Sequence, residues 1–171
     1  MGITNREFKK RRKEIMSRME PNSISLLSSA PECLRNNDAE YQYRQNSDFY
    51  YLTGFTEPHA ILVLVPGREQ GEVILFCREK NEEKELWTGF ILGPEAAIDS
   101  LKIDDAYPIE DVDEIISGLI EGKDRIYYSM GRDAQFDRRV MTWVKNLRNN
   151  AKVGPPPPSE FQVLDHLLHE L

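Results

Sequence analysis

Two apolar runs joined by a short turn constrain the fold of this chain more than any other feature. Residues 60–65 (AILVLV) form a continuous apolar run, which is typical of a central strand covered on both faces. Pro66 and Gly67 make a turn, and residues 73–77 (VILFC) follow as a second apolar run. The pattern predicts a β-hairpin over residues 60–77, with a slightly long loop, inside a larger sheet.

Helical patterns and further short strands alternate along the rest of the chain. Thr4 and Glu7 form a capping box before an apolar stripe, which predicts a helix over residues 5–19. We expect further helices as a single turn through Phe49 and Leu52, from Pro94 onward, from Asp111 or Asp113 to Gly122, and over 134–148. We expect further strands at residues 24–28, through Trp87, at 125–128 and, as strand or loop, at 103–108. Strands interspersed with helices predict an α/β fold in three layers, with a mixed β-sheet flanked by helices.

Size, composition and charge exclude several classes of function. A chain of 171 residues with 40% hydrophobic and 30% charged residues is typical of one soluble globular domain, with or without a tail. The net charge of −7 argues against a general nucleic-acid binder and against docking on an anionic membrane. The one basic run, residues 9–13, lies inside the first predicted helix, and we interpret it as a solvated helix face.

The sequence shows neither a membrane-spanning stretch nor a secretory signal. No segment approaches the roughly 20 apolar residues of a membrane span, and the N-terminus has no apolar middle region. Cys33 and Cys77 do not form a C-x-x-C pair, and Cys77 lies in an apolar strand. We therefore expect a cytoplasmic protein with reduced thiols and an inert thiol at Cys77.

Residues 35–58 combine many aromatic rings with many hydrogen-bonding side chains. Four tyrosines and two phenylalanines lie there among arginine, aspartate and glutamine. Rings that bury apolar area while keeping a polar tip suit a partly buried site or an interface. The alternative is a core segment whose polar atoms are paired internally. The stretch alone assigns no chemistry.

Motifs for catalysis or cofactor binding are missing from the sequence. There is no G-x-G-x-x-G and no P-loop, and the serines at 25, 28 and 29 have no G-x-S-x-G context. His166 and His169 lie three residues apart, but no thiolate or second cluster accompanies them, and we interpret them as surface or interface residues. We assign no catalytic residue and no metal ligand to this chain.

The order of residues from Arg35 to Pro58 resembles a known family signature. It is similar to the N-terminal domain of bacterial Xaa-Pro aminopeptidase (aminopeptidase P), in the creatinase and prolidase family. The matching positions are Arg35, Asp38, Tyr43, Arg44, Gln45, Ser47, Phe49, Tyr51, Leu52, Gly54, Phe55, Glu57 and Pro58. The resemblance continues through Glu85, Trp87, Gly89, Gly93, Ala96 and Ala97, although Phe90 and Ile91 stand where members often have an arginine. After a proline run, His169, Glu170 and Leu171 match the opening of the family's catalytic domain.

The resemblance implies a division of the chain and a function. Residues 1–152 would be the N-terminal domain, 153–159 a stiff proline-rich linker, and 160–171 the truncated start of the catalytic domain. The family's N-terminal domain has the three-layer architecture described above. The whole enzyme would use two Mn²⁺ ions, held by residues beyond this chain, to release the N-terminal residue preceding proline. This piece would be non-catalytic and would serve oligomerisation and control of substrate access.

Partners and candidate site residues also follow from the resemblance. The expected partners are the protein's own catalytic domain, further copies in a dimer or tetramer, and a proline-containing peptide. The resemblance implies that Trp87 would shape the substrate pocket of a neighbouring subunit. The alternative roles for Trp87 are a core residue or an interface anchor. Weaker candidates for a substrate-shaping or interface role, unless they are paired internally, are Arg35, Tyr43, Arg44 and Asp48.

Two other functions stay open at this point. Proline dipeptidases of the same family have an N-terminal domain of similar fold, and the length of the preferred peptide would separate them. A stand-alone interaction module built on a pseudo-enzyme fold is the second alternative. The acidic charge permits a basic partner for such a module but does not require one.

Overall fold

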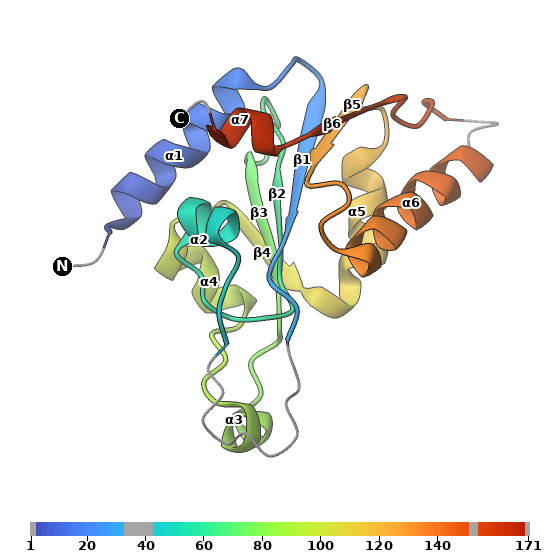
Figure 1. Ribbon diagram of the computed structural model, residues 1–171. Helices are drawn as coiled ribbons and strands as arrows, with labels where there is room; N and C mark the ends of the chain where they lie inside the picture. Colours follow the sequence, from blue (N-terminus) through green and yellow to red (C-terminus); the bar gives the residue numbers. More distant parts are fainter. Residues whose placement is uncertain (1–2, 33–42, 151–153, 170–171) are drawn as a thin grey trace.

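A six-stranded mixed sheet forms the centre of the described residues 3–32, 43–150 and 154–169 of the computed structural model (Figure 1). The strand order across the sheet is β4-β3-β2-β1-β5-β6. The expected hairpin is confirmed, because β2 and β3 pair antiparallel with Leu62 opposite Leu75. The strands are β1 (Ser23–Ser28), β2 (Ile61–Leu64), β3 (Val73–Cys77), β4 (Asp105–Pro108), β5 (Arg125–Tyr128) and β6 (Glu160–Val163).

Both strand directions occur in the sheet. β1 and β2 pair antiparallel, as do β2 and β3, whereas the pairs β1–β5, β3–β4 and β5–β6 are parallel. Parallel neighbours need long crossover connections, and in this chain those connections contain helices. The predicted α/β fold with a mixed sheet is therefore confirmed.

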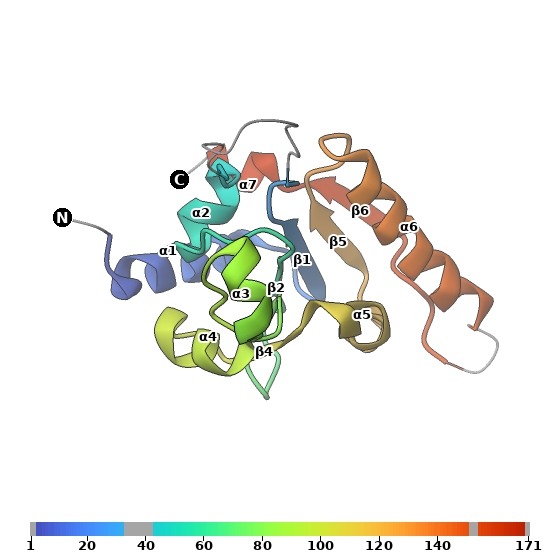
Figure 2. The same ribbon diagram turned by 90° about the horizontal axis from the view of Figure 1, so that it is seen from below.

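Helices cover both faces of the sheet (Figures 1 and 2). Helices α1, α2, α4 and α7 lie on one face, α5 and α6 lie on the other, and α3 lies beyond one end of the sheet. The helices are α1 (Asn5–Arg18), α2 (Ser47–Thr53), α3 (Glu82–Thr88), α4 (Pro94–Leu101), α5 (Val112–Ile120), α6 (Ala134–Asn149) and α7 (Asp165–His169), with a 3-10 turn at Ile109–Asp111.

Alternate side chains of β2 supply the two cores. Leu62 and Leu64 pack with side chains of α1, α2 and α7, whereas Ile61 and Val63 pack with those of α5 and α6. All four are buried. Burying an aliphatic side chain of this size stabilises the fold by about 1.5–3 kcal/mol. A strand covered on both faces has no polar side, which explains why its sequence is continuously apolar.

Arg12 corrects the prediction of a solvated basic face on α1. Its side chain is 1% exposed, and its guanidinium donates to the backbone carbonyls of Leu52 (2.8 Å), Leu101 and Lys102 (both 3.4 Å). These carbonyls lie at the ends of α2 and α4, where they have no partner within their own helix. Burial lowers the pKa of Arg12 to about 10, while the negative charge of Asp104 acts in the opposite direction. The lysines of the same run are exposed, as expected.

The strand predicted through Trp87 is wrong, because Trp87 lies in helix α3. The side chain of Asn81 accepts a hydrogen bond from the Lys84 N–H at 3.1 Å and so caps the helix. Glutamates follow in the first turn, where negative charge favours a helix. Gly89, with a φ of 86°, ends the helix. These local signals override the β-propensity of the tryptophan.

The other helix predictions agree with the structure apart from one cap. Helix α4 begins with Pro94, and α6 spans nearly the predicted residues. The side chain of Thr4 caps α1 by accepting a hydrogen bond from the Glu7 N–H. Asp111 precedes α5, but its side chain makes no capping hydrogen bond. Asp113 accepts a hydrogen bond from the indole N–H of Trp143 at 2.7 Å and so links α5 to α6.

The segment after the proline run packs on this domain. Residues 160–163 form β6, which pairs with β5 at the edge of the sheet. Leu164 and Leu167 are buried in the same core as Ile15 of α1. The division at residues 153–159 stays a prediction, but residues 160–168 contribute to the core in this structure. None of the helices in the described part of the chain has the length and apolar character needed to span a lipid bilayer.

Candidate functional site

Helix α3 and the residues just after it present large apolar side chains away from the core. Leu86, Trp87 and Phe90 are 85%, 90% and 67% exposed, and no residue of α3 is buried. The helix follows β3 and precedes α4 in the chain, and Figure 1 shows it apart from the sheet. Core packing therefore does not hold α3 in place, and polar contacts must fix its position.

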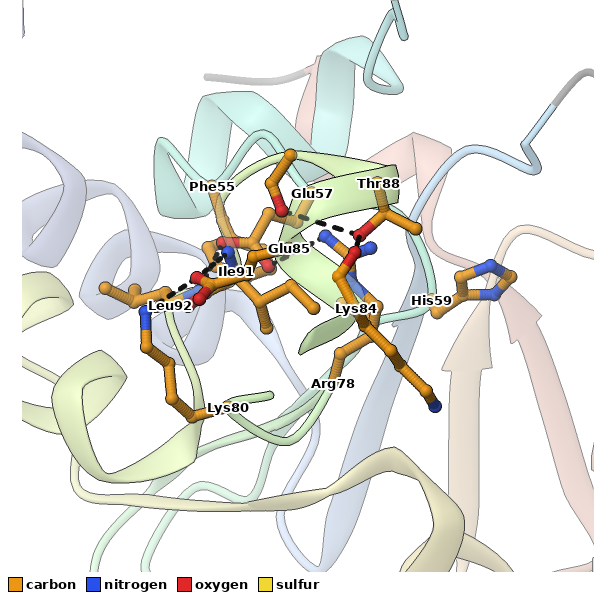
Figure 3. A network of polar contacts seen from close by, with 12 residues as sticks. Phe55, Glu57, His59, Arg78, Lys80, Lys84, Glu85, Thr88, Ile91 and Leu92 are labelled. Atoms are coloured by element: carbon orange, nitrogen blue, oxygen red, sulfur yellow. Dashed lines mark hydrogen bonds and ion pairs between the residues drawn. The ribbon is translucent and has the colours of Figure 1, made fainter. Parts of the chain in front are cut away.

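Glu85, within α3, holds together the segment before the helix and the segment after it. One carboxylate oxygen of Glu85 accepts hydrogen bonds from the Lys80 Nζ at 2.6 Å and from the Ile91 N–H at 2.7 Å (Figure 3). The Lys80 ammonium also donates to the Ile91 carbonyl at 3.0 Å and lies 4.3 Å from the centre of the Phe90 ring. These hydrogen bonds, the one from Lys80 first, lower the pKa of Glu85. The carboxylate is therefore kept ionised.

Glu57 ties the loop after α3 to the rest of the domain. Its Oε2 accepts the backbone N–H of Leu92 at 3.0 Å, and its Oε1 accepts a hydrogen bond from Arg78 at 3.1 Å (Figure 3). Both side chains of this ion pair are largely buried. Arg78 opens a highly charged stretch of sequence, residues 78–84, for which solvent exposure would be expected, but its side chain is held inside the domain. The side chain of Ile91, whose own N–H is held by Glu85, is buried.

Gln45 connects this network to the aromatic stretch. Its side-chain oxygen accepts the backbone N–H of Ala30 at 2.7 Å and the hydroxyl of Tyr43 at 3.0 Å. Its amide nitrogen donates to the carbonyls of Phe55 and Glu57 at 3.2 and 3.0 Å. The Tyr43 hydroxyl also donates to the Ala30 carbonyl, and burial is the largest influence raising the pKa of Tyr43. Tyr43 thus uses its polar tip inside the domain.

The remaining candidates from the sequence take no part in this network. Asp48, in the first turn of α2, pairs with Arg132 at 2.7 Å, and Arg44 is exposed. Arg35 lies outside the described residues. Figure 1 shows the helix that carries Asp48, α2, apart from the helix that carries Trp87, α3.

The described residues do not fit a metal centre. Among them, no group of three or more histidine, cysteine, aspartate or glutamate side chains is arranged to hold a metal ion. His59 pairs with Glu32 at 2.9 Å, and the carboxylates that converge near α2 are bridged by Arg132. The thiol of Cys77 is buried, and this burial raises its pKa to about 12.

A pocket of about 830 Å³ lies between α3 and α6, beside the end of β1. Its lining includes Arg78, His59 and Arg139. Each of these is already paired, with Glu57, Glu32 and Asp113 respectively. The pocket therefore offers no uncompensated charge from these three residues.

Comparison with known proteins decides the family of this fold. The sequence model of the family "Aminopeptidase P, N-terminal domain" matches residues 8–127. The chain belongs to this family. The match includes α3 with Trp87, the Glu57 anchor and Gln45.

Relatives of this aminopeptidase P N-terminal domain are much longer proteins. The chain is similar to the solved structure of Pseudomonas aeruginosa aminopeptidase PepP, with 53% identity and a TM-score of 0.94, over 98% of this chain and 38% of that one. It is 35% identical over 170 residues to the Xaa-Pro aminopeptidase of Escherichia coli, covering 99% of this chain and 38% of the relative. The solved Escherichia coli aminopeptidase P, in a low-pH form, superposes with a TM-score of 0.92 at 34% identity, over 99% of this chain and 39% of that one. The aminopeptidase P N-terminal domain thus spans about two fifths of these relatives.

Several residues that organise this aminopeptidase P N-terminal domain had no role from the sequence alone. Glu57 and Glu85 stand in the family signature. The signature indicated that both residues matter, but it did not identify the groups that they contact. Lys80 and Arg132 stand outside it. Their partners were not apparent in the sequence because the contacts depend on how distant elements pack.

Proposed function

We propose that this domain is the non-catalytic N-terminal part of a manganese-dependent Xaa-Pro aminopeptidase. The whole enzyme releases an N-terminal residue that precedes proline. The two Mn²⁺ ions and the reacting groups belong to the catalytic domain that follows, in the cytoplasm. Family membership supports this assignment, together with the Xaa-Pro aminopeptidases of which the chain matches about two fifths.

The domain serves oligomer contacts and control of substrate access. The observation that carries this part is the exposure of Trp87 on a helix whose position is fixed by Glu57 and Glu85. An exposed apolar patch is typical of an interaction site, and tryptophan is favoured at interface hot spots. Because the helix backbone is already held, a contact through Trp87 costs little further backbone entropy. In the oligomer, a dimer or tetramer, Trp87 borders the substrate pocket of a neighbouring subunit.

The other candidate residues have secondary parts in this proposal. Arg44 is exposed and is available for a contact across the interface. Tyr43 and Asp48 act from within the domain by holding the segment around α2. Arg35, from the same signature, is a further candidate contact.

Two preparations test the proposed function. The first is the 171-residue chain alone, and the second is a chimera that joins it to the catalytic domain of the Pseudomonas aeruginosa relative. With Mn²⁺ and an Arg-Pro-Pro peptide, the chimera should release the first residue and the chain alone should not. Metal-dependent release by the chain alone, or an inactive but folded chimera, contradicts the proposal.

A further inference from the structure

The last described segment is held on the domain by backbone pairing and burial. β6 runs parallel to β5, with Glu160 opposite Arg125 and Val163 opposite Tyr128. The turn into α7 then buries Leu164, which is 0% exposed. Helix α7 has only five residues, so it contributes little rigidity of its own.

An arginine joins this segment to two other elements. The guanidinium of Arg132, in the loop between β5 and α6, lies 2.7 Å from the carboxylate of Asp48 and 3.3 Å from that of Asp165. Asp48 is in the first turn of α2, and Asp165 is the first residue of α7. The Ser129 hydroxyl also donates to the second oxygen of Asp165 at 2.8 Å. A planar guanidinium can bond two carboxylates at once in a fixed geometry, which an ammonium cannot.

The loop that carries Arg132 is itself fixed. The N–H of Gly131 donates to both carboxylate oxygens of Asp137, on α6, at 3.1 and 3.2 Å. Partial burial opposes the charge on Arg132, but the carboxylates of Asp48 and Asp165 raise its pKa overall. The cation is therefore present at all physiological pH values.

We propose that Asp48, Arg132 and Asp165 are positioning residues, an ionic latch that sets the direction in which the chain leaves α7 toward the catalytic domain. This inference rests on the proposed function. The burial of Leu164 and Leu167 already attaches the segment, and a half-exposed ion pair adds little to that attachment. What the latch adds is orientation, since it restrains a one-turn helix at its first residue from two directions.

Hydrogen exchange in the 171-residue chain tests the latch without any activity. Arg132→Gln should speed amide exchange in residues 160–168 by about fivefold, the equivalent of a weak ion pair. Exchange in β2 and β3 should not change. Lys102→Gln removes an exposed ion pair on α4 and is the matched control. No change at 160–168, or an equal increase in all strands, overturns the proposal.

Kinetics in the chimera test the orientation itself. At a temperature where all variants are folded, Arg132→Gln should lower kcat/KM about threefold to tenfold, mostly through KM, because the catalytic domain then sits differently relative to the N-terminal domain. Asp165→Asn should have the same effect, and the double variant should lose no more than either single one. Arg132→Lys should fall between the parent and Arg132→Gln. Unchanged kinetics with only a lower melting temperature overturn the latch as a positioning device. An inactive parent chimera contradicts the proposed function instead, and the exchange data then decide on the latch.

Discussion

The carboxylate of Glu57 accepts a hydrogen bond from the backbone N–H of Leu92, 35 residues further along the chain, at 3.0 Å. The same carboxylate pairs with Arg78, and the carbonyl of Glu57 accepts from Gln45. One residue thus links the aromatic stretch, the end of β3 and the loop after α3. The exposed helix with Trp87 is positioned by buried polar groups rather than by an apolar core.

Replacing Glu57 should destabilise the domain. Glu57→Gln keeps an acceptor for the Leu92 N–H but leaves the largely buried Arg78 without its counter-charge. The expected loss is about 1–3 kcal/mol in the free energy of unfolding, measured by urea titration. Asp99→Asn, which breaks an exposed pair with Lys102, should change it by less than about 0.5 kcal/mol. Equal effects of the two substitutions would contradict the role given to Glu57.

Stability should depend on pH through Glu85. The pKa of Glu85 is lowered in the folded domain. Its contribution to stability is therefore complete above its pKa in the unfolded chain, about 4.3, and is lost as the pH falls through the lower pKa of the folded state. The difference in urea midpoint between the parent and Glu85→Gln should therefore be largest near neutral pH and shrink below about pH 4. A difference that does not vary with pH would show that the charge of Glu85 is unimportant.

Trp87 should matter for contacts and not for folding. Because Trp87 is 90% exposed, Trp87→Ala should change the free energy of unfolding by less than about 0.5 kcal/mol. In the chimera it should raise KM for the proline peptide or weaken the oligomer, as followed by kinetics and light scattering. Trp143→Phe is the contrasting variant, since it loses the partly buried hydrogen bond to Asp113 and should cost about 1–2 kcal/mol. Strong destabilisation by Trp87→Ala would refute the assignment.

Arg12 should be more important for stability than its neighbours in the basic run. Arg12→Met leaves the carbonyls of Leu52, Leu101 and Lys102 without their donor and should cost about 2–3 kcal/mol. Lys13→Met, one residue along the same helix, is exposed and should have almost no effect. Urea titrations of both variants make the comparison, and matching midpoints would mean that Arg12 is not a structural residue.

The parts of the fold that follow from local patterns were predictable. The apolar runs at 60–65 and 73–77 indicated the hairpin, because a doubly covered strand has no polar face. The family signature likewise directed attention to Trp87. The strand predicted through Trp87 was wrong because Asn81, seven residues before the end of α3, caps a helix that the β-propensity of a single tryptophan does not reveal.

The contacts that organise the candidate site were not predictable in the same way. Arg132 meets Asp48 across 84 positions of sequence, and Glu57 meets Leu92 across 35. No local pattern around a single arginine or glutamate in a sequence predicts which distant residue it will contact. Such pairs become visible only when the sheet has brought β1, β5 and the helices around them together.

The parallel pairing of β6 with β5 decides which core each side chain of the last strand enters. Side chains on a strand alternate between the two faces of the sheet, so a slip of one residue along β5 would exchange those faces. Phe161 would then turn from the core under α5 and α6 to the opposite one, and Leu164 would leave the core that it shares with α1. The placement of Glu160 opposite Arg125 therefore governs how the segment through α7 packs on the domain.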